Sequence, residues 1–523
     1  MKHLLLGLLA TALITGLPTG CGSSGHPVDN ATGFVTGIMD ELATPTQADW
    51  GSDGRLYVAT LGGTIYAYSF DDDYRITGKQ AIATLAGLDD RYILGIAGNP
   101  FDPPGTTTIY VSHSRLFTGA PCPVITHEYA GRVSMLTGPD FDTLTPVITG
   151  LPSSPGGHGV NNLLFDNDGD LLIAQGGQTN AGVPHCAQGG LPESPLSGAV
   201  LKARLSDPDF DGEITYVERD GGTPNNDQVD GDIVELAEPA YVGVFAAGLR
   251  NPFDLVLTTA GLLYATDNGP NGPSGAEGDV STGPGTSAPI GESAPDELNL
   301  LEAGHYYGHP NRNRGIDDDR QNVYYGPDAE TGDFTQAIAW FPSTTNGLDE
   351  YRAQTFGGAF RGSLMLVHWT KGLYRARLSA NGRSVVTHEL VNSEMPGIGL
   401  VAGPGGVLFS ADYLGGKLRM AAPLAADSGG PQVHDIFPWR APSTGGSRFV
   451  ISGSGFGTAA NTAVTIGGAA ASITRVSPTR IIGTIPAETE PTADLVDVVV
   501  IANGVSRTLP AAFRYLIPPV PGP

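Results

Sequence analysis

Two segments of this 523-residue chain carry side chains suited to acid–base and anion chemistry. His158 lies in a Gly-rich loop just before an expected strand, where an unprotonated imidazole could take a proton from a substrate hydroxyl. Arg250 and Asn251 precede Pro252, whose restricted backbone would keep the Arg donors facing a carboxylate or quinone oxygen. Two alternatives stay open: His158 could merely cap a turn, and Arg250 could form a structural salt bridge.

An acidic segment, residues 207–218, fits the full twelve-residue calcium-loop pattern, with Gly212 at the sharp turn. The carboxylates at the ligand positions are Asp207, Asp209, Asp211 and Glu218. Expected strands flank the segment, so it would be an isolated calcium loop rather than part of a helix–loop–helix sensor. A solvated acidic hairpin is the alternative.

Two further segments could face a hard cation. The carbonyls of Gly269 and Pro270 belong to an Asn-Gly-Pro turn, which also forms readily without metal. Asp296 and Glu297 follow an insertion rich in Gly, Ser and Pro. These two acids could bind calcium or join two structural units, and the sequence does not separate the two uses.

A repeated strand pattern must position these residues. Each copy has a Gly-bearing turn, an apolar strand of the Leu-Tyr-Val type and a second strand ending in a polar residue. The copies lie at Gly54–Ala59, Thr108–Ser112, Gly169–Ala174, Gly261–Ala265, Gly362–Val367 and Gly406–Ser410. The pattern predicts an all-β fold, a six-bladed β-propeller over residues 35–424, whose loops converge at one mouth.

The composition changes at residues 425–430, which are expected to form a linker. Short strands separated by Gly turns then predict an immunoglobulin-like β-sandwich over residues 431–517. The run Ser452-Gly453-Ser454-Gly455-Phe456-Gly457 and the later Ile466-Gly467-Gly468 resemble the IPT/TIG domain. This resemblance implies a spacing or binding role, toward a glycan or a protein. Residues 518–523 are a proline-rich tail.

The N-terminal residues 1–20 have the anatomy of a signal peptide, with a basic start and an apolar stretch from Leu4 to Leu17. The Gly20-Cys21 junction resembles a bacterial lipobox, so we expect an acylated Cys21, a linker over residues 21–34 and membrane contact only through the lipid. The expected location is the cell envelope, with secretion as the alternative. Cys122 and Cys186 could then pair in an oxidising compartment or remain isolated thiols.

The charge balance excludes one class of partner. Lys and Arg total 28 against 54 Asp and Glu, which gives a formal net charge of −26. Such a surface repels a free polyanion, so we expect no nucleic-acid partner.

Taken in order, five motifs resemble the soluble PQQ-dependent glucose and aldose sugar dehydrogenases, the sorbosone dehydrogenase-like family, over about residues 35–422. They are His158, Gly248–Pro252, Asn268–Pro270, Asp296–Asn299 and Tyr307–Pro310. The resemblance implies a sugar substrate, pyrroloquinoline quinone (PQQ) and Ca²⁺, with His158 as the base. It also implies that Arg250 and Asn251 line the quinone, that carbonyls of Gly269 and Pro270 bind the calcium, and that Lys371 contacts PQQ.

The chain departs from that family where its members place arginines on the PQQ carboxylates. Residues 395–400 are uncharged here, and Asn162 stands near the place of another Arg. Arg91, Arg352 and Arg361 could supply the missing charge. The departure keeps two other functions open: a non-catalytic propeller that binds a glycan or protein, and a metal-dependent hydrolase such as a lactonase.

Overall fold

The computed structural model describes most of the chain between residues 28 and 519. The described residues are 28–29, 33–88, 91–116, 129–154, 156–183, 188–191, 193–218, 234–272, 276–277, 293–309, 335–424 and 430–519. The predictions for residues 1–20, Cys21, Cys122, Cys186, residues 520–523 and all of the linker but residue 430 lie outside this set. Within these ranges the elements are strands and a few short 3-10 helices, which confirms the predicted all-β class.

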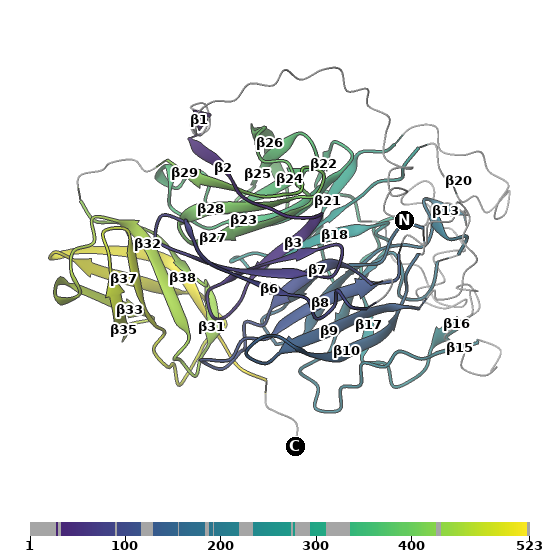
Figure 1. Ribbon diagram of the computed structural model, residues 1–523, viewed down its shortest axis with the longest axis horizontal. Helices are drawn as coiled ribbons and strands as arrows, with labels where there is room; N and C mark the ends of the chain where they lie inside the picture. The colour runs from purple at the N-terminus through teal and green to yellow at the C-terminus, as the bar shows by residue number, and fades with distance from the viewer. Residues whose placement is uncertain are drawn as a thin grey trace.

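Six antiparallel sheets form the blades of a propeller (Figure 1). From the inner strand outward, blade 1 consists of β3 (Pro45–Trp50), β4 (Leu56–Thr60), β5 (Ile65–Phe70) and β6 (Ile76–Ile82). Blade 2 consists of β7 (Tyr92–Gly98), β8 (Ile109–Ser114), β9 (Gly131–Thr137) and β10 (Thr143–Leu151). Blade 3 consists of β11 (Val160–Phe165), β12 (Leu171–Gln175), β14 (Ala199–Ala203) and β17 (Val242–Ala247).

Blades 4 to 6 continue the ring, and the last one closes it. Blade 4 consists of β18 (Pro252–Leu257), β19 (Leu263–Asp267), β21 (Asp296–Leu301) and β22 (Ala339–Phe341). Blade 5 consists of β23 (Thr345–Tyr351), β24 (Ser363–His368), β25 (Gly372–Leu378) and β26 (Val385–Asn392). Blade 6 consists of β27 (Gly399–Gly403), β28 (Val407–Asp412), β29 (Lys417–Pro423) and β2 (Phe34–Glu41). Strand β2 comes from the N-terminal side of the propeller and pairs with β29, so the two ends of the propeller segment share one blade.

Burial follows each strand's place in its blade. The β4 segment Leu-Tyr-Val-Ala-Thr is buried at every position because neighbouring blades pack on both of its faces. The outer strand β6 alternates between exposed and partly buried side chains, as a rim strand with one solvated face should. The apolar core is therefore divided into clusters between adjacent blades.

The inner strands are joined around the central channel by side chains that accept backbone N–H groups of a neighbouring blade. Asp49 accepts from Gly98 at 2.9 Å, and Asn162 accepts from Ile96 at 3.2 Å. Asp254 accepts from Leu348 at 2.8 Å, and Asp349 accepts from Ala402 at 2.7 Å. The Trp50 indole N–H donates to the Ala402 carbonyl at 3.1 Å, which joins the last blade to the first.

Asp254 makes the densest of these connections. Its Oδ1 accepts from the Asn162 side chain and the Leu255 amide, and its Oδ2 accepts from the Gln47 side chain and the Leu348 amide. The one carboxyl thereby joins inner strands of four blades. Burial raises the pKa of Asp254 to about 7, although the hydrogen bonds oppose that shift.

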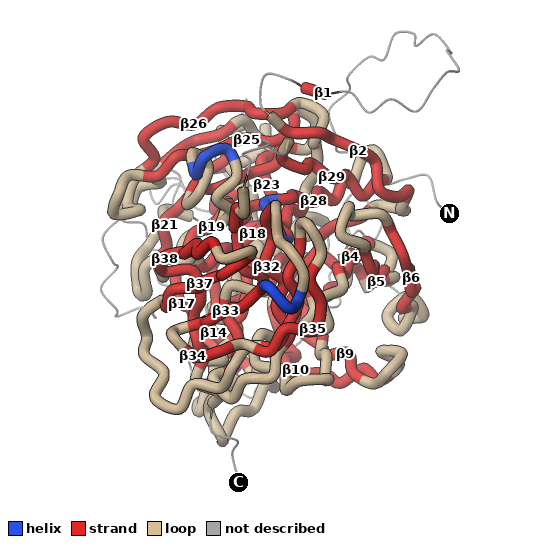
Figure 2. Tube along the Cα trace, turned by 90° about the vertical axis from the view of Figure 1, so that its left-hand side faces the viewer, coloured by secondary structure: helices blue, strands red, loops and turns tan. Residues whose placement is uncertain are grey.

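The C-terminal domain is a β-sandwich of two sheets, which confirms the predicted immunoglobulin-like fold. Its strands are β30 (Gln432–Phe437), β32 (Arg448–Ser454), β36 (Arg480–Thr484) and β35 (Ser472–Val476) in one sheet, and β31 (Arg440–Pro442), β38 (Val505–Leu516), β37 (Val496–Ala502), β33 (Thr462–Ile466) and β34 (Ala469–Ala470) in the other. Figure 2 shows this domain in front of the middle of the propeller, with β26, β6 and β10 around it.

The sandwich contacts the end of the propeller at which the inner strands finish. Arg440 donates to the Phe165 carbonyl at 2.6 Å and to Asn167 Oδ1 at 2.7 Å. The Gly405 amide donates to Asp435 at 2.7 Å, and the rings of Trp50 and Phe437 lie 5.3 Å apart. The two domains therefore share a buried polar and aromatic seam that covers this end of the channel.

Among the described residues, no helix is long and apolar enough to cross a membrane.

Replacing Asp254 with Asn should destabilise the fold although the two side chains have nearly the same shape. All four partners of the carboxyl donate hydrogen bonds, so an amide N–H₂ must face two donors. We expect the free energy of unfolding to fall by about 2–4 kcal/mol in chemical denaturation. Asp140→Asn, on an exposed turn, is the matched control; equal effects would contradict this role for Asp254.

Replacing Arg440 with Ala should also lower stability, because it leaves the Phe165 carbonyl and Asn167 without their donor in the domain seam. The expected loss is about 2–4 kcal/mol, seen as a lower midpoint of thermal unfolding. The exposed Arg377→Ala is the control, and an unchanged midpoint for Arg440→Ala would show that the seam contributes nothing.

Candidate functional site

His158 lies at the mouth of the propeller, the end at which the inner strands begin, two residues before β11. Its Nδ1 is 2.9 Å from the Gly177 carbonyl oxygen. A carbonyl can only accept, so Nδ1 carries the hydrogen and the neutral ring keeps a lone pair on Nε2. His158 as a residue is partly exposed.

The surroundings keep this imidazole neutral. Burial and the neighbouring Arg250 charge lower the pKa of His158 to about 3, whereas the Gly177 hydrogen bond opposes the shift. An unprotonated imidazole at neutral pH is the form required of a general base.

Arg250 is fully buried beside this loop. Its Nε donates to the Asn180 carbonyl at 2.9 Å, and its guanidinium also reaches Asn180 Oδ1 at 2.7 Å and the Asn268 carbonyl at 3.1 Å. Asp267 accepts the backbone N–H of Arg250 at 3.0 Å and that of Asn251 at 2.7 Å. The carboxylate thereby holds the backbone of both residues in place.

Asn251 connects the His158 loop to the next blade. Its Oδ1 accepts from Asn161 at 2.8 Å, and its Nδ2 donates to Asn268 Oδ1 at 3.0 Å. A Cβ on Gly176 would lie 2.6 Å from His158 Cβ and 2.7 Å from Asn251 Oδ1. The absence of a side chain at Gly176 therefore lets the predicted base and the Arg-Asn pair approach each other.

The Asn268–Pro270 turn is held by Asp296 rather than by a cluster of carboxylates. Asp296 accepts from the Gly269 amide at 3.0 Å, the Asn268 side chain at 2.8 Å and the Thr345 amide at 2.7 Å. Burial raises the pKa of Asp296 to about 7. Asp296 therefore joins blades 4 and 5, and Glu297 follows it on β21.

The calcium loop over residues 207–218 stays a prediction, because the side chain of its last ligand, Glu218, lies outside the described residues. Among the described residues, no three His, Cys, Asp or Glu side chains come together as metal ligands, so Asp207, Asp209 and Asp211 do not converge. Asp207 and Asp211 instead accept backbone N–H groups two residues further on. A Cβ on Gly212 would lie 1.8 Å from the Val147 carbonyl oxygen, so this glycine serves packing.

Lys371 lies at the mouth, on the turn between β24 and β25, and is exposed. Its backbone N–H and that of Thr370 donate to His368 Nδ1 at 3.1 and 3.0 Å. Burial and the Lys371 charge lower the pKa of His368 to about 4. The turn that presents Lys371 is thus fixed by a neutral, buried imidazole.

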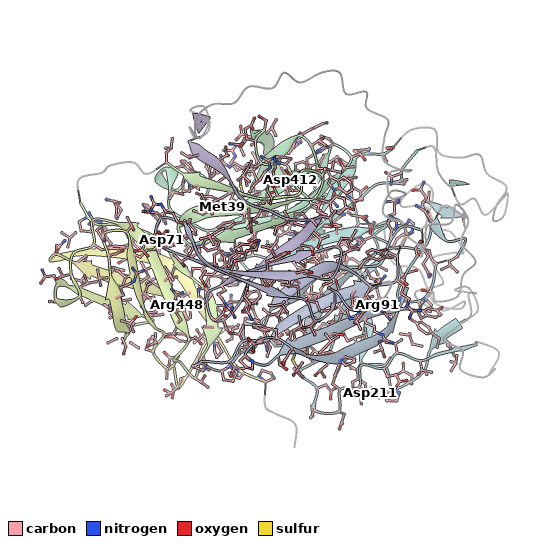
Figure 3. All side chains as sticks on the ribbon, in the orientation of Figure 1. Met39, Asp71, Arg91, Asp211, Asp412 and Arg448 are labelled. Atoms are coloured by element: carbon pink, nitrogen blue, oxygen red, sulfur yellow. The ribbon has the colours of Figure 1, made fainter. Side chains whose placement is uncertain are left out.

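The three arginines considered as substitutes for the missing charges lie at opposite ends of the molecule. Arg91 precedes β7 at the mouth and lies far from the C-terminal domain (Figure 3). Arg115 follows β8 opposite it, because Tyr92 pairs with Ser114. Arg352 contacts Asp349 and lies against Trp439, and Arg361 bonds to the Pro510 carbonyl, so both face the sandwich domain.

The structure explains two of the positions at which the sequence departs from the family pattern. Asn162 belongs to the channel network with Asp254 and Ile96, so this position serves the ring and not an anion. Met395 and Ile398 are buried apolar residues, so the segment before β27 belongs to the core.

The sequence did not reveal Asn180, Asp267 or the pair of Glu193 with His309. Asp267 ends a strand directly before the Asn-Gly-Pro turn, and Asn180 follows the Gln-Gly-Gly end of β12, so their places after strands were the only signals. Glu193 lies in a loop with no pattern of its own. Its partner is 116 positions away, which no local pattern can indicate.

Comparison with known proteins gives two family matches. The glucose/sorbosone dehydrogenase model matches residues 42–412, and the IPT/TIG domain model matches residues 431–515. No curated protein matches.

Among solved structures, a putative oxidoreductase (glucose dehydrogenase) from Thermus thermophilus is 19% identical, with 74% of this chain and 100% of that chain covered and a TM-score of 0.46. The PQQ-bound aldose sugar dehydrogenase from Streptomyces coelicolor is 16% identical, with coverage of 76% and 99% and a TM-score of 0.45. The PQQ domain of pyranose dehydrogenase from Coprinopsis cinerea is 13% identical, with coverage of 77% and 98% and a TM-score of 0.47. These values are too low to transfer the role of a residue.

The ring of His158 should remain neutral well below the pH at which an ordinary histidine is half protonated. In protein labelled with ¹⁵N-histidine, we expect its ring nitrogens to keep the shifts of a neutral Nδ1–H imidazole from about pH 7.5 down to about pH 5. Because its folded pKa lies below the unfolded value, the stability it contributes is present above about pH 6.5 and is lost as the pH falls toward 3. His158→Asn assigns the signal; half-protonation near pH 6.5 would contradict the assignment.

Proposed function

The chain belongs to the glucose/sorbosone dehydrogenase family, and from that membership we propose that it oxidises an aldose sugar, or a related aldehyde or alcohol, with PQQ and Ca²⁺. The observation that carries the proposal is His158, a neutral imidazole with its Nδ1 bound to a carbonyl and its Nε2 available at the mouth. Bound PQQ supplies the hydride acceptor. His158 Nε2 takes the proton of the sugar hydroxyl while the neighbouring donors hold the reactants.

The residues at the mouth fit the chemistry of PQQ, which carries carboxylates and quinone oxygens. Arg250 and Asn251 would line the quinone, and Lys371 would pair with a carboxylate. Arg91 and Arg115 add cationic groups at the mouth end of blade 2. Positive groups close to developing negative charge stabilise it more strongly in a site that excludes water. This set replaces the charges that the apolar residues 395–400 cannot supply.

Calcium would bind at the carbonyl oxygens of Gly269 and Pro270. The Gly269 amide donates to Asp296, which fixes the turn, and the Pro270 carbonyl already accepts from Ala294 at 2.8 Å. A carbonyl oxygen has two lone pairs, so one remains for a cation.

The location and further partners belong to the same proposal. The expected export signal and acylated Cys21 would place the propeller in the cell envelope, anchored by lipid or, in the alternative, secreted. The IPT/TIG domain would bind a glycan or protein by surfaces away from the seam with the propeller.

Titration of calcium-loaded protein with PQQ tests the proposal. We expect saturable binding, and reduction of an electron-accepting dye with at least one sugar from a panel of aldoses. His158→Ala should lower turnover by about 10²–10⁴-fold with PQQ affinity retained, because the base touches the sugar hydroxyl rather than the quinone. His388→Ala, an exposed histidine on β26, is the control. Wild-type protein that neither binds PQQ nor reduces the dye would favour the non-catalytic binding propeller.

A further inference from the structure

Glu193 and His309 form a buried pair directly behind the site. Glu193 Oε1 lies 2.7 Å from His309 Nε2, and the two residues are 5% and 2% exposed. A carboxylate removed from water is stable only when hydrogen-bond donors satisfy its oxygens, so Glu193 must accept hydrogen bonds from further groups besides His309.

The partners of Glu193 lie mainly on one loop, residues 176–180, which follows β12. Glu193 accepts from the Gln178 amide at 2.9 Å, from the Thr179 amide at 2.8 Å and from the Thr179 hydroxyl at 2.7 Å. Ser197 donates to the same carboxylate. These bonds and the one from His309 hold the pKa of Glu193 below its usual value although burial alone would raise it.

The same loop presents the acceptors that orient both site residues. The Gly177 carbonyl accepts from His158 Nδ1, and Asn180 accepts from Arg250 through its carbonyl and its side chain. The Gly177 amide also donates to the Arg250 carbonyl at 2.7 Å. A shift of this loop would therefore move the imidazole and the guanidinium together.

Gly177 lies between the Glu193–His309 pair and the Arg250 backbone. A Cβ there would lie 3.0 Å from both Glu193 Oε1 and His309 Nε2, and 2.8 Å from the Arg250 carbonyl oxygen. His309 is itself fixed, because its backbone N–H donates to the Gly248 carbonyl at 2.7 Å, just before Arg250. The pair thus spans the His158 blade and the Arg250 turn.

We infer that Glu193 and His309 are positioning residues for the proposed dehydrogenation: they fix the loop whose Gly177 carbonyl holds His158 in its Nδ1–H tautomer and whose Asn180 holds Arg250. The inference rests on the proposed function for its catalytic consequence. The tautomer of His158, in contrast, is a property of the protein without cofactor.

Four variants separate positioning from general stability. Glu193→Gln places an amide N–H₂ among donors, and His309→Leu removes the donor to Glu193. His309→Gln is the conservative control, because its side-chain amide can still donate. Thr179→Val keeps the shape and deletes the hydroxyl bond to Glu193, together with the bond that this hydroxyl accepts from the Gly182 amide, so it tests the loop if Glu193→Gln and His309→Leu fail to fold.

The measurement is the ¹⁵N spectrum of the His158 ring in the full-length protein without PQQ. Wild type and His309→Gln should keep the Nδ1–H tautomer, whereas Glu193→Gln, His309→Leu and, to a smaller extent, Thr179→Val should show a mixture of both tautomers. In the PQQ-loaded protein, turnover of Glu193→Gln and of His309→Leu should fall by about 10- to 100-fold, because a small misplacement of a reacting group has that effect.

An unchanged His158 tautomer in folded Glu193→Gln, or in Thr179→Val if the former does not fold, would overturn the inference. If wild-type protein neither binds PQQ nor oxidises a sugar, the proposed function fails, and the tautomer measurement still decides the positioning role. The two failures are therefore distinguishable.

Discussion

The ring of inner strands depends on one constraint, which is that backbone N–H groups facing the central channel must find acceptors. No strand can supply them, since each inner strand is the last of its sheet. Asp49, Asn162, Asp254 and Asp349 supply them instead, each to a neighbouring blade. Buried carboxyl and amide groups are costly when unpaired, so their complete pairing favours one arrangement of the six blades.

The candidate site uses the same arrangement. His158 and Arg250 lie just before the inner strands β11 and β18, so the network that fixes these strands also fixes the start of each loop. Asn161, the residue before Asn162 on β11, joins the two strands at the mouth. Its side-chain amide donates to Asn251 Oδ1 and to the Pro252 carbonyl. The geometry of the base is therefore a property of the whole ring and not of one loop.

The architecture and the places of the main site residues could be predicted from the sequence, because repeated strands have a local pattern and a propeller brings the starts of its inner strands together. The family and the fold are confirmed. The calcium loop was predicted from the spacing of Asp207, Asp209 and Asp211 and stays a prediction, because spacing does not specify backbone path. Its Gly212 packs against the Val147 carbonyl. Glu193 with His309 could not be predicted, because the pair depends on a contact between distant loops.

The position of the sandwich domain bears on the direction from which reactants approach His158. Its Trp439 and Arg440 are buried at the end of the channel opposite His158, so this domain covers the channel end that the proposed site does not use. In the proposed reaction the sugar, its oxidised product and the external electron acceptor would therefore approach from the mouth.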